Sequence, residues 1–411
     1  MSVLRPADTD PSDDADSASA TARVANGDVS TGGTVASDPA STLTRDSSGS
    51  TVSTAQQLLA AGDGVARRAM ARDLLAAIVV PIVGLIVALV VGGVLIALIG
   101  ERPISVYADV FNGVFFEPRG LSDTATAATP LLLIALGYAF AYRARVFTIG
   151  AEGQYVVAAA ASVGVVTAGG MQSLPGPLLI IIGIVVGAAA GALWSGICGV
   201  LNVRFGASVV ISSLMLVYIG LSVLQWSTRV GIRDPESFVA LSRPVGNAEL
   251  PIVPVLDVHL GFVIAALLVP VMTWVLSRHR FGFRIRALGY NPEAVEANEV
   301  PAGRVIVAVL LVAGALAGLA GFVEIAGVNG RLNDAASVGY GFTAIIVALV
   351  GRLHPVGVFI AALLIAGLDI GFEVVARSSE LPTSMAGLVQ VLVVIFVVAG
   401  DAVLERRRTA S

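Results

Sequence analysis

Ten apolar runs, each close to the length needed to cross a lipid bilayer, dominate the sequence between residues 74 and 402. A helix that crosses the hydrocarbon core needs about 20 mostly apolar residues, and its backbone groups must hydrogen-bond within the segment. The runs lie at 74–99, 125–142, 147–168, 178–200, 208–226, 260–276, 305–327, 340–351, 355–374 and 384–402. Run 340–351 is too short to span alone, unless it begins earlier or enters as a broken helix. The pattern predicts an all-α polytopic membrane protein with about ten transmembrane helices.

The composition excludes several classes of chemistry. Hydrophobic residues make up 56% of the 411 residues and charged residues 13%, against about 25% charged in soluble domains. All 25 basic residues are arginine, so the chain has no lysine for nucleotide phosphates, a Schiff base or a Ser-Lys dyad. The single Cys198 cannot form an intrachain disulfide, and the three histidines are far apart. We therefore expect no enzyme, catalytic residue, cofactor, metal site or nucleic-acid partner. If ATP drives this protein, a separate subunit hydrolyses it.

The two termini are predicted to lie in the cytoplasm. Residues 1–66 are acidic and rich in Ser and Thr, with few residues that could form a core, and are predicted to be a disordered tail ahead of a transmembrane domain at 67–408. Ten crossings place fifteen arginines inside and seven outside, as the positive-inside rule requires. The inside set is Arg67, Arg68, Arg72, Arg143, Arg145, Arg204, Arg278, Arg280, Arg284, Arg286, Arg304, Arg352, Arg406, Arg407 and Arg408, and the outside set is Arg102, Arg119, Arg229, Arg233, Arg243, Arg331 and Arg377.

Two long loops face opposite sides of the membrane. The external loop 227–258 is rich in proline and forms either a small cap or docking surface, or a linker; the sequence leaves both open. In the internal loop 277–304, Asn291 followed by Pro292 signals a helix start, Glu293 and Glu296 suit the positive N-terminus, and Pro301 ends it. This pattern predicts a short helix across the cytoplasmic face.

A weak internal symmetry relates the two halves. Each half contains a run interrupted by glycine and polar residues, at Gly150–Gln154 and at Gly339–Thr343. With five crossings per half, the second repeat is inverted relative to the first. Transporters built on inverted repeats carry their substrate path between the repeats.

Glu152 begins a membrane-length run, where an ionisable group is costly and usually faces a cavity or a partner. It could be an ion or proton site, a substrate contact or a packing element. Alternatively, the helix starts later and Glu152 lies at the interface beside Arg143 and Arg145. Gly150 and Gly153 permit a helix break, and Gln154 can hydrogen-bond across helices.

Four other carboxylates lie in or near apolar runs. Glu324 and Asp369 are candidates for interior polar contacts, more often structural hydrogen bonds than substrate contacts. Glu373 is expected at the outer rim and Asp401 at the interface.

Glycine motifs in the runs indicate close helix packing. The pairs Gly187/Gly191 and Gly314/Gly318 have the G-x-x-x-G spacing that lets helices approach. The segment Gly339–Ala344 matches a dinucleotide-binding turn, but no strand precedes it and no acidic residue follows at the expected distance. We interpret its glycines as bending or thinning a helix that faces a pore.

Three stretches resemble the permease subunits of binding-protein-dependent ABC importers of the ribose and nucleoside type. They are Phe147-Thr-Ile-Gly-Ala-Glu-Gly-Gln154, Arg286-Ala-Leu-Gly-Tyr-Asn-Pro-Glu-Ala-Val295 and the segment from Tyr340 to Pro355. The resemblance covers about residues 72 to 404. Thr148 stands where the family usually has Asn, which puts a direct substrate contact from that position in doubt.

The resemblance implies a permease subunit in a bacterial plasma membrane. Its expected partners are a cytoplasmic ATP-binding subunit, a second permease subunit such as a paralogue, an extracytoplasmic solute-binding protein and membrane lipid. The Glu-Gly-Gln form favours a nucleoside or simple sugar over a branched-chain amino acid. The helix near Asn291 would dock in the ATPase and convert its closure into rocking of the two repeats.

The resemblance also assigns roles to residues. The substrate path would include Thr148, Glu152, Gln154, Phe342 and Thr343. The structural glycines would be Gly150, Gly153, Gly339 and Gly341. Coupling to the ATPase would use Gly289, Asn291, Pro292, Glu293 and Glu296.

The competing hypothesis is an ion-coupled secondary transporter that acts without an ATPase, with Glu152, Glu324 and Asp369 as its relay. Uptake driven by an ion gradient alone would favour it. An adjacent gene for a double ATPase would favour the importer. For a third class, an intramembrane enzyme, the sequence offers no catalytic constellation.

Overall fold

The computed structural model describes residues 83–254, 257–291, 301–337, 339–378, 387–389, 391–393, 395–396 and 399–400. The predicted tail 1–66, the predicted helix that starts at Pro292, and Asp401 lie outside these residues.

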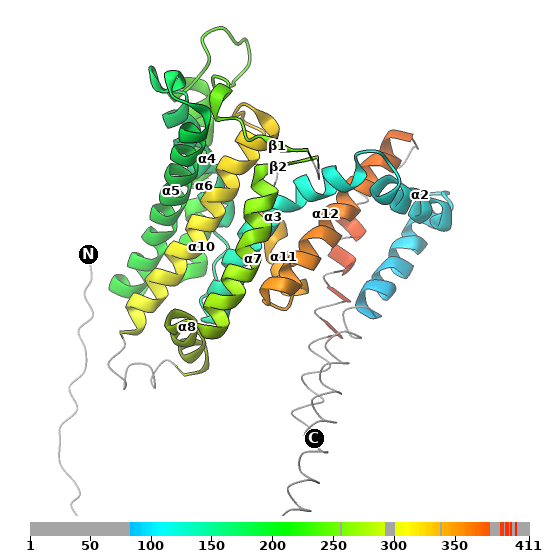
Figure 1. Cartoon of the computed structure of the whole chain (residues 1–411). Coiled ribbons are helices and arrows are strands. Elements are labelled where there is room, and N and C mark those ends of the chain that lie inside the picture. The colour runs from blue at the N-terminus through cyan, green and yellow to red at the C-terminus, as the bar shows by residue number, and fades with distance from the viewer. Residues whose placement is uncertain are drawn as a thin grey trace, which may run out of the picture. The chain divides into compact units, whose positions relative to one another are not determined.

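Helices make up almost all of the described chain (Figure 1). They are Val83–Leu98, α2 (Pro103–Phe115), α3 (Gly120–Arg143), α4 (Ala151–Val166), α5 (Gly176–Phe205), α6 (Val209–Trp226), α7 (Leu260–Arg278), α8 (Arg280–Tyr290), α10 (Ala302–Glu324), α11 (Tyr340–Val350) and α12 (Pro355–Ser378). Short 3-10 turns lie at Met171–Ser173 and Gly246–Ala248, and π-helical turns extend α6 and α10 at Ser227–Gly231 and Ile325–Asn329. β1 (Ile252–Val253) and β2 (Val258–His259) pair antiparallel, with Ile252 opposite His259.

The apolar runs form helices long enough to cross a membrane, which confirms the all-α polytopic prediction. Among the described residues, six helices qualify by length and composition: α5, α7, α12, α3, and α6 and α10 with their π turns. Val83–Leu98 and α2 form a seventh only as a pair bent by 117°. The apolar helices α4 and α11 are shorter, with 16 and 11 residues.

Two helices form the centre of the bundle. Within their apolar windows, α3 is 89% buried and α10 is 67% buried, whereas α6 and α7 are 22% buried. The largest fully buried side chains include Tyr138, Tyr155 and Phe322. Helices α5, α6 and α7 therefore leave most of their apolar surface for lipid or a partner chain.

Helices α5 and α10 touch backbone to backbone along their glycines. A Cβ atom on Gly191 would lie 2.2 Å from the Gly314 carbonyl oxygen, and one on Gly318 would lie 2.1 Å from that of Gly187. The two G-x-x-x-G motifs are thus opposite sides of one interface, which joins the first half of the chain to the second.

Two described helices, α2 and α8, lie where the sequence pattern predicts connections. α2 starts with Pro103 at its first turn, which is a helix-start signal that lies outside the long apolar runs. α8 occupies the first part of the internal loop, and its start at His279 lacks the usual cap residues. There the His279 ring Nδ1 accepts a hydrogen bond from the Phe281 N–H at 3.1 Å. The buried Gly282, Ile285 and Leu288 share one face of α8.

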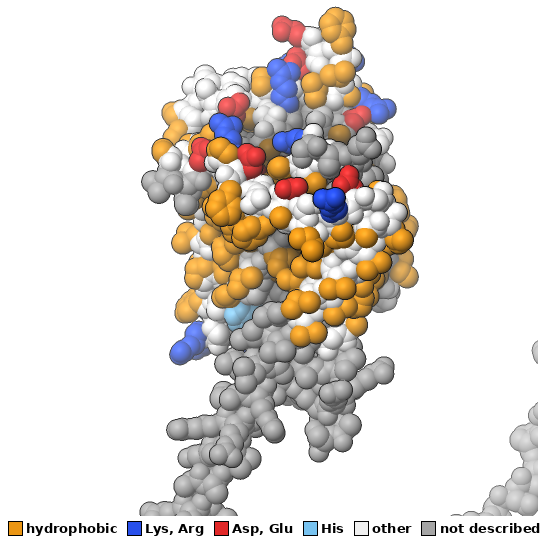
Figure 2. All heavy atoms as spheres, turned by 90° about the vertical axis from the view of Figure 1, so that its right-hand side faces the viewer, with side chains coloured by type: hydrophobic (Ala, Val, Ile, Leu, Met, Phe, Trp, Pro, Cys, Tyr) orange, Lys and Arg blue, Asp and Glu red, His pale blue; other side chains and the backbone are white. Residues whose placement is uncertain are grey.

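The two ends of the bundle differ in charge. The α8 end, where α3, α5 and α7 finish and α10 begins, carries arginines and no described Asp or Glu: Arg143, Arg145, Arg204, Arg278, Arg280, Arg284, Arg286, Arg304 and Arg352. The opposite end, here the cap end, is formed around the connection 232–250. On the face in Figure 2, acidic and basic side chains mix above a broad hydrophobic band.

Candidate functional site

Two short helices start inside the bundle rather than at its ends. α4 starts after Gly150, and α11 starts after Gly339, which has a left-handed φ of +85°. Irregular chain leads toward each helix, at 144–150 and at 330–337. These are the two interruptions that the sequence pattern singled out.

The short helices run toward opposite ends. At the end of α4, the Val166 carbonyl accepts a hydrogen bond at 2.7 Å from Gln172, which also contacts the cap connection. After the end of α11, the Leu353 carbonyl accepts one at 2.9 Å from Arg143 at the α8 end. An inverted repeat requires this opposite direction.

Glu152 joins the starts of the two short helices. It lies in the first turn of α4 and is 1% exposed. One carboxylate oxygen accepts from the Ser337 hydroxyl at 2.5 Å and the Gly339 N–H at 3.2 Å, and the other accepts from the Gly341 N–H at 2.6 Å. Because helix N-termini carry a partial positive charge, two of them stabilise the Glu152 carboxylate.

Glycine allows the backbones to approach at this junction. A Cβ atom on Gly341 would lie 2.3 Å from the Glu152 backbone nitrogen. On the other side of α4, a Cβ on Gly153 would lie 2.8 Å from the Val217 Cα, and one on Gly150 would lie 2.8 Å from the Ser213 Cβ. α4 is therefore held between α6 and α11 at distances that larger residues would not permit.

The residues assigned to the substrate path divide into two groups. Thr148, Glu152 and Gln154 are buried, with 1%, 1% and 2% exposure. The Thr148 hydroxyl accepts from the Gly150 N–H at 3.3 Å, so it supports the turn before α4. Phe342 is 43% exposed and Thr343 is partly exposed. Of these five residues, only Phe342 and Thr343 on α11 have side chains that are accessible in this chain alone.

A second buried carboxylate lies at the end of α10. Glu324 is 6% exposed, and its Oε1 lies 3.5 Å from both the Tyr340 hydroxyl and the Asn329 amide. The Tyr340 ring meets the Tyr155 ring edge-on, with centroids 6.0 Å apart. Sequence reasoning did not single out Tyr340 or Tyr155, although Tyr340 opens the third motif.

The remaining carboxylates occupy different settings. Glu373 is exposed and forms an ion pair at 2.6 Å with Arg377, one turn later. Asp369 is half-buried and lies close enough to Tyr340 to interact with it electrostatically.

The α8 end of the bundle is connected directly to the α4 start. A Cβ on Gly289 would lie 2.2 Å from the Arg143 carbonyl oxygen, so the end of α8 rests on the end of α3. Arg143 also donates its Nε–H to Leu353. From Arg143, seven residues of irregular chain, 144–150, lead to α4. Asn291 caps α8, donating its backbone N–H to the Ala287 carbonyl at 3.0 Å.

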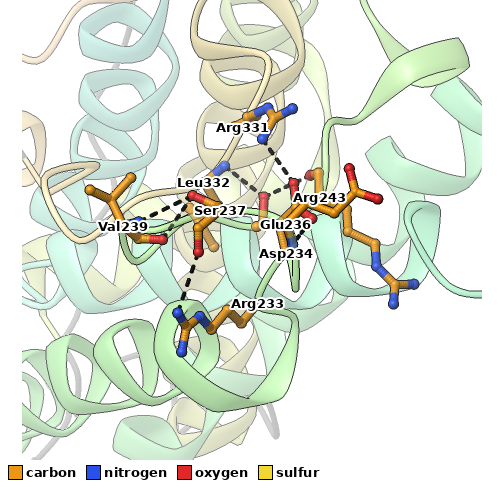
Figure 3. Close-up of polar contacts among 9 residues, drawn as sticks. Arg233, Asp234, Glu236, Ser237, Val239, Arg243, Arg331 and Leu332 are labelled. Carbon is orange, nitrogen blue, oxygen red and sulfur yellow. Dashed lines mark hydrogen bonds and ion pairs between the residues drawn. The ribbon is translucent and has the colours of Figure 1, made fainter.

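At the cap end, the connection 232–250 is an ordered structure rather than a linker (Figure 3). The Ser242 N–H donates to the Leu332 carbonyl at 2.8 Å, and the Leu332 N–H donates to the Ser242 hydroxyl at 2.9 Å. Arg331 pairs with Asp234 at 3.0 Å. Beside them lies a cavity of about 540 Å³, lined by Thr167, Gln172, Asp234, Pro235, Glu236, Arg243, Pro244, Gly246 and Arg331.

A further set of polar contacts holds the irregular chain that leads toward α11. Asp334 accepts from the Thr228 hydroxyl and pairs with Arg229 at 2.8 Å. The Thr228 hydroxyl, and then Arg229, hold the pKa of Asp334 below its usual value of 3.8. The π turn after α6 thus anchors the segment that carries Ser337.

Two interrupted helices that start inside a bundle of apolar helices define a class of protein, the membrane transporters whose site lies between repeats. The family described as branched-chain amino acid transport system / permease component matches residues 120–398, and the chain belongs to it. It is a multi-pass membrane protein and a permease subunit of an ABC importer, hence a transport component rather than an enzyme.

Several known permeases are similar over most of their length. A guanosine ABC transporter permease protein of Bacillus subtilis, NupP, is 31% identical over 79% of this chain and 94% of its own. A glucose ABC transporter permease protein of Haloferax volcanii, TsgB13, is 31% identical over 78% and 87%. A nucleoside ABC transporter permease protein of Lactococcus lactis, NupB, is 28% identical over 78% and 90%. No solved structure matches the chain.

Proposed function

We propose that this permease moves an uncharged, ring-containing solute, a nucleoside or a simple sugar, into a bacterial cell. The observation that carries the proposal is the junction at Glu152, where both carboxylate oxygens already accept hydrogen bonds from the chain itself. The accessible groups nearby are the Phe342 ring and the Thr343 hydroxyl. An aromatic face and a hydroxyl suit a sugar or a nucleobase, whereas a zwitterionic amino acid needs charged partners. The named activities of NupP, NupB and TsgB13 agree.

The α8 end faces the cytoplasm in this proposal. The nine described arginines there, with no described carboxylate beside them, follow the positive-inside rule. The cap end then faces the outside and receives the solute-binding protein. Its outermost part exposes Phe238 completely and Val239 by 62%, which gives a binding protein an apolar contact.

A cytoplasmic ATP-binding subunit would push on the segment that follows α8. The force would pass through Gly289 to the Arg143 carbonyl, then along 144–150 to Glu152 and the start of α11. A second permease subunit would complete the path beside Phe342.

The proposal is tested by uptake into proteoliposomes that contain the chain, a second permease, the ATP-binding subunit and the binding protein. We expect ATP-dependent uptake of guanosine or glucose and none of leucine. Uptake of leucine alone would overturn the solute class. Uptake driven by an ion gradient without ATP would instead support the hypothesis of a secondary transporter.

Coupling has its own test. Reversing the charge of Glu293 together with Glu296 is expected to uncouple ATP hydrolysis from uptake while the protein stays in the membrane. Normal uptake by that variant would exclude the assigned coupling role.

A further inference from the structure

A pocket of about 440 Å³ lies at the corner where α7 turns into α8. The corner is tight, because a Cβ on Gly282 would lie 2.2 Å from the Val275 carbonyl oxygen. α8 therefore starts directly against the last turns of α7. This pocket is separate from the Glu152 junction and from the cap cavity.

The pocket is lined by guanidinium groups. Among the residues that the structure describes, its lining includes Arg278, Arg280, Arg284, Arg286, Ser277 and Phe283, and no Asp or Glu. Arg278, Arg280 and Arg284 are exposed and Arg286 is partly exposed. Guanidinium groups bind phosphate oxygens through paired hydrogen bonds, and four of them around one cavity favour an anion with a phosphate group.

An apolar stripe leads along α7 into this pocket. Val263, Leu267, Val271 and Trp274 follow one another at helical spacing and are 36%, 67%, 44% and 57% exposed. The Trp274 ring lies 5.7 Å from the His279 ring at the pocket's edge. Tryptophan prefers the membrane interface, so the stripe suits acyl chains and the pocket suits a headgroup.

We propose that the α7–α8 corner binds an anionic phospholipid, with its phosphate among the four arginines and its acyl chains along the α7 stripe. Basic pockets beside transmembrane helices are known to select anionic headgroups. A free phosphate would use the arginines but not the stripe, which is why the lipid is favoured. The proposal does not depend on the transported solute.

The test uses the full chain in phosphatidylcholine vesicles that contain phosphatidylglycerol, with bromine on the acyl chains of one lipid at a time. Trp194→Phe with Trp226→Phe leaves Trp274 as the reporter, and Trp194→Phe with Trp274→Phe leaves Trp226 at the cap end as the reference. We expect brominated phosphatidylglycerol to quench Trp274 more strongly than brominated phosphatidylcholine does, with no such preference at Trp226.

Charge removal then locates the site. Arg280→Gln with Arg284→Gln is expected to lower the preference roughly fivefold for each arginine. Arg204→Gln, an exposed arginine at the same end but outside the pocket, serves as the matched control and should keep the preference.

Three results would overturn the proposal. Equal quenching of Trp274 by the two lipids would mean that no anionic lipid is selected. Loss of the preference on adding inorganic phosphate would make the site a free-phosphate site. Loss of the preference when the ATP-binding subunit is added would mean that the subunit covers the pocket.

Discussion

Replacing Glu152 by alanine should destabilise the protein as well as stop transport. The change removes three hydrogen bonds, from Ser337, Gly339 and Gly341, at a site that is 1% exposed. Two of the donors are backbone N–H groups, and each one left unpaired in the interior costs about 1–3 kcal/mol. We therefore expect Glu152→Ala to lose roughly 2–6 kcal/mol of stability, summed over the two groups.

Glutamine separates the effects of shape and charge. Its carbonyl oxygen can replace the oxygen that faces Ser337 and Gly339, but its NH₂ group would face the Gly341 N–H. Glu152→Gln should therefore cost less than the alanine change.

Temperature-dependent size exclusion of the detergent-solubilised protein measures stability, and ATP-driven uptake in proteoliposomes measures transport. Glu373→Ala is the control carboxylate, since its exposed pair with Arg377 should contribute only about 0.3–0.5 kcal/mol. If Glu152→Ala unfolds at the same temperature as Glu373→Ala but loses uptake, Glu152 is a solute contact and the junction argument fails. If uptake is unchanged as well, the hydrogen bonds of Glu152 contribute to neither stability nor transport.

Three further predictions concern other parts of the chain. Gly318→Ala places a Cβ 2.1 Å from a carbonyl oxygen on α5 and should lower the free energy of unfolding by about 1–3 kcal/mol. Gly169→Ala, whose Cβ would meet nothing within 4 Å, should leave the stability nearly unchanged. Equal melting temperatures of the two variants would contradict the close packing of α5 and α10. Burial, and then the charge of Arg143, lower the pKa of His354 in the turn after α11, so the folded chain binds fewer protons than the unfolded chain. Stability should then fall as the pH drops below about 6.5 toward the folded-state pKa, and His354→Asn should flatten that slope in melting curves. A double-mutant cycle on Asp234 and Arg331 should give a coupling free energy of at most about 1 kcal/mol, and a value near zero would remove the pair from the forces that order the cap.

The sequence predicted where the helices lie because a span requires a long apolar run, and such runs are visible locally. Helices α2 and α8 were not predicted, because both are short and lie outside the long apolar runs. Pro103 is a local start signal for α2, whereas His279 is not a usual cap residue, and only the folded chain shows that its ring caps α8.

The partners of the marked residues could not be predicted. Glu152 and the Gly341 N–H are 189 positions apart, and no local pattern pairs them. Likewise, each G-x-x-x-G motif predicts a close helix contact, but only the fold shows that the two motifs contact each other. The order of the cap connection also depends on a distant partner, because Ser242 is hydrogen-bonded to Leu332, 90 positions away.

The glycine contact between α5 and α10 bears on how such a transporter can move. If the first and second halves of one chain pivoted apart, the carbonyl groups of Gly187 and Gly314 would leave their glycine neighbours on the facing helix, and the close backbone packing between α5 and α10 would be lost. We therefore expect each chain to move as one rigid unit against its partner chain, in place of the rocking of its own two repeats that the family resemblance implies. A disulfide designed to lock α5 to α10 should therefore leave transport intact.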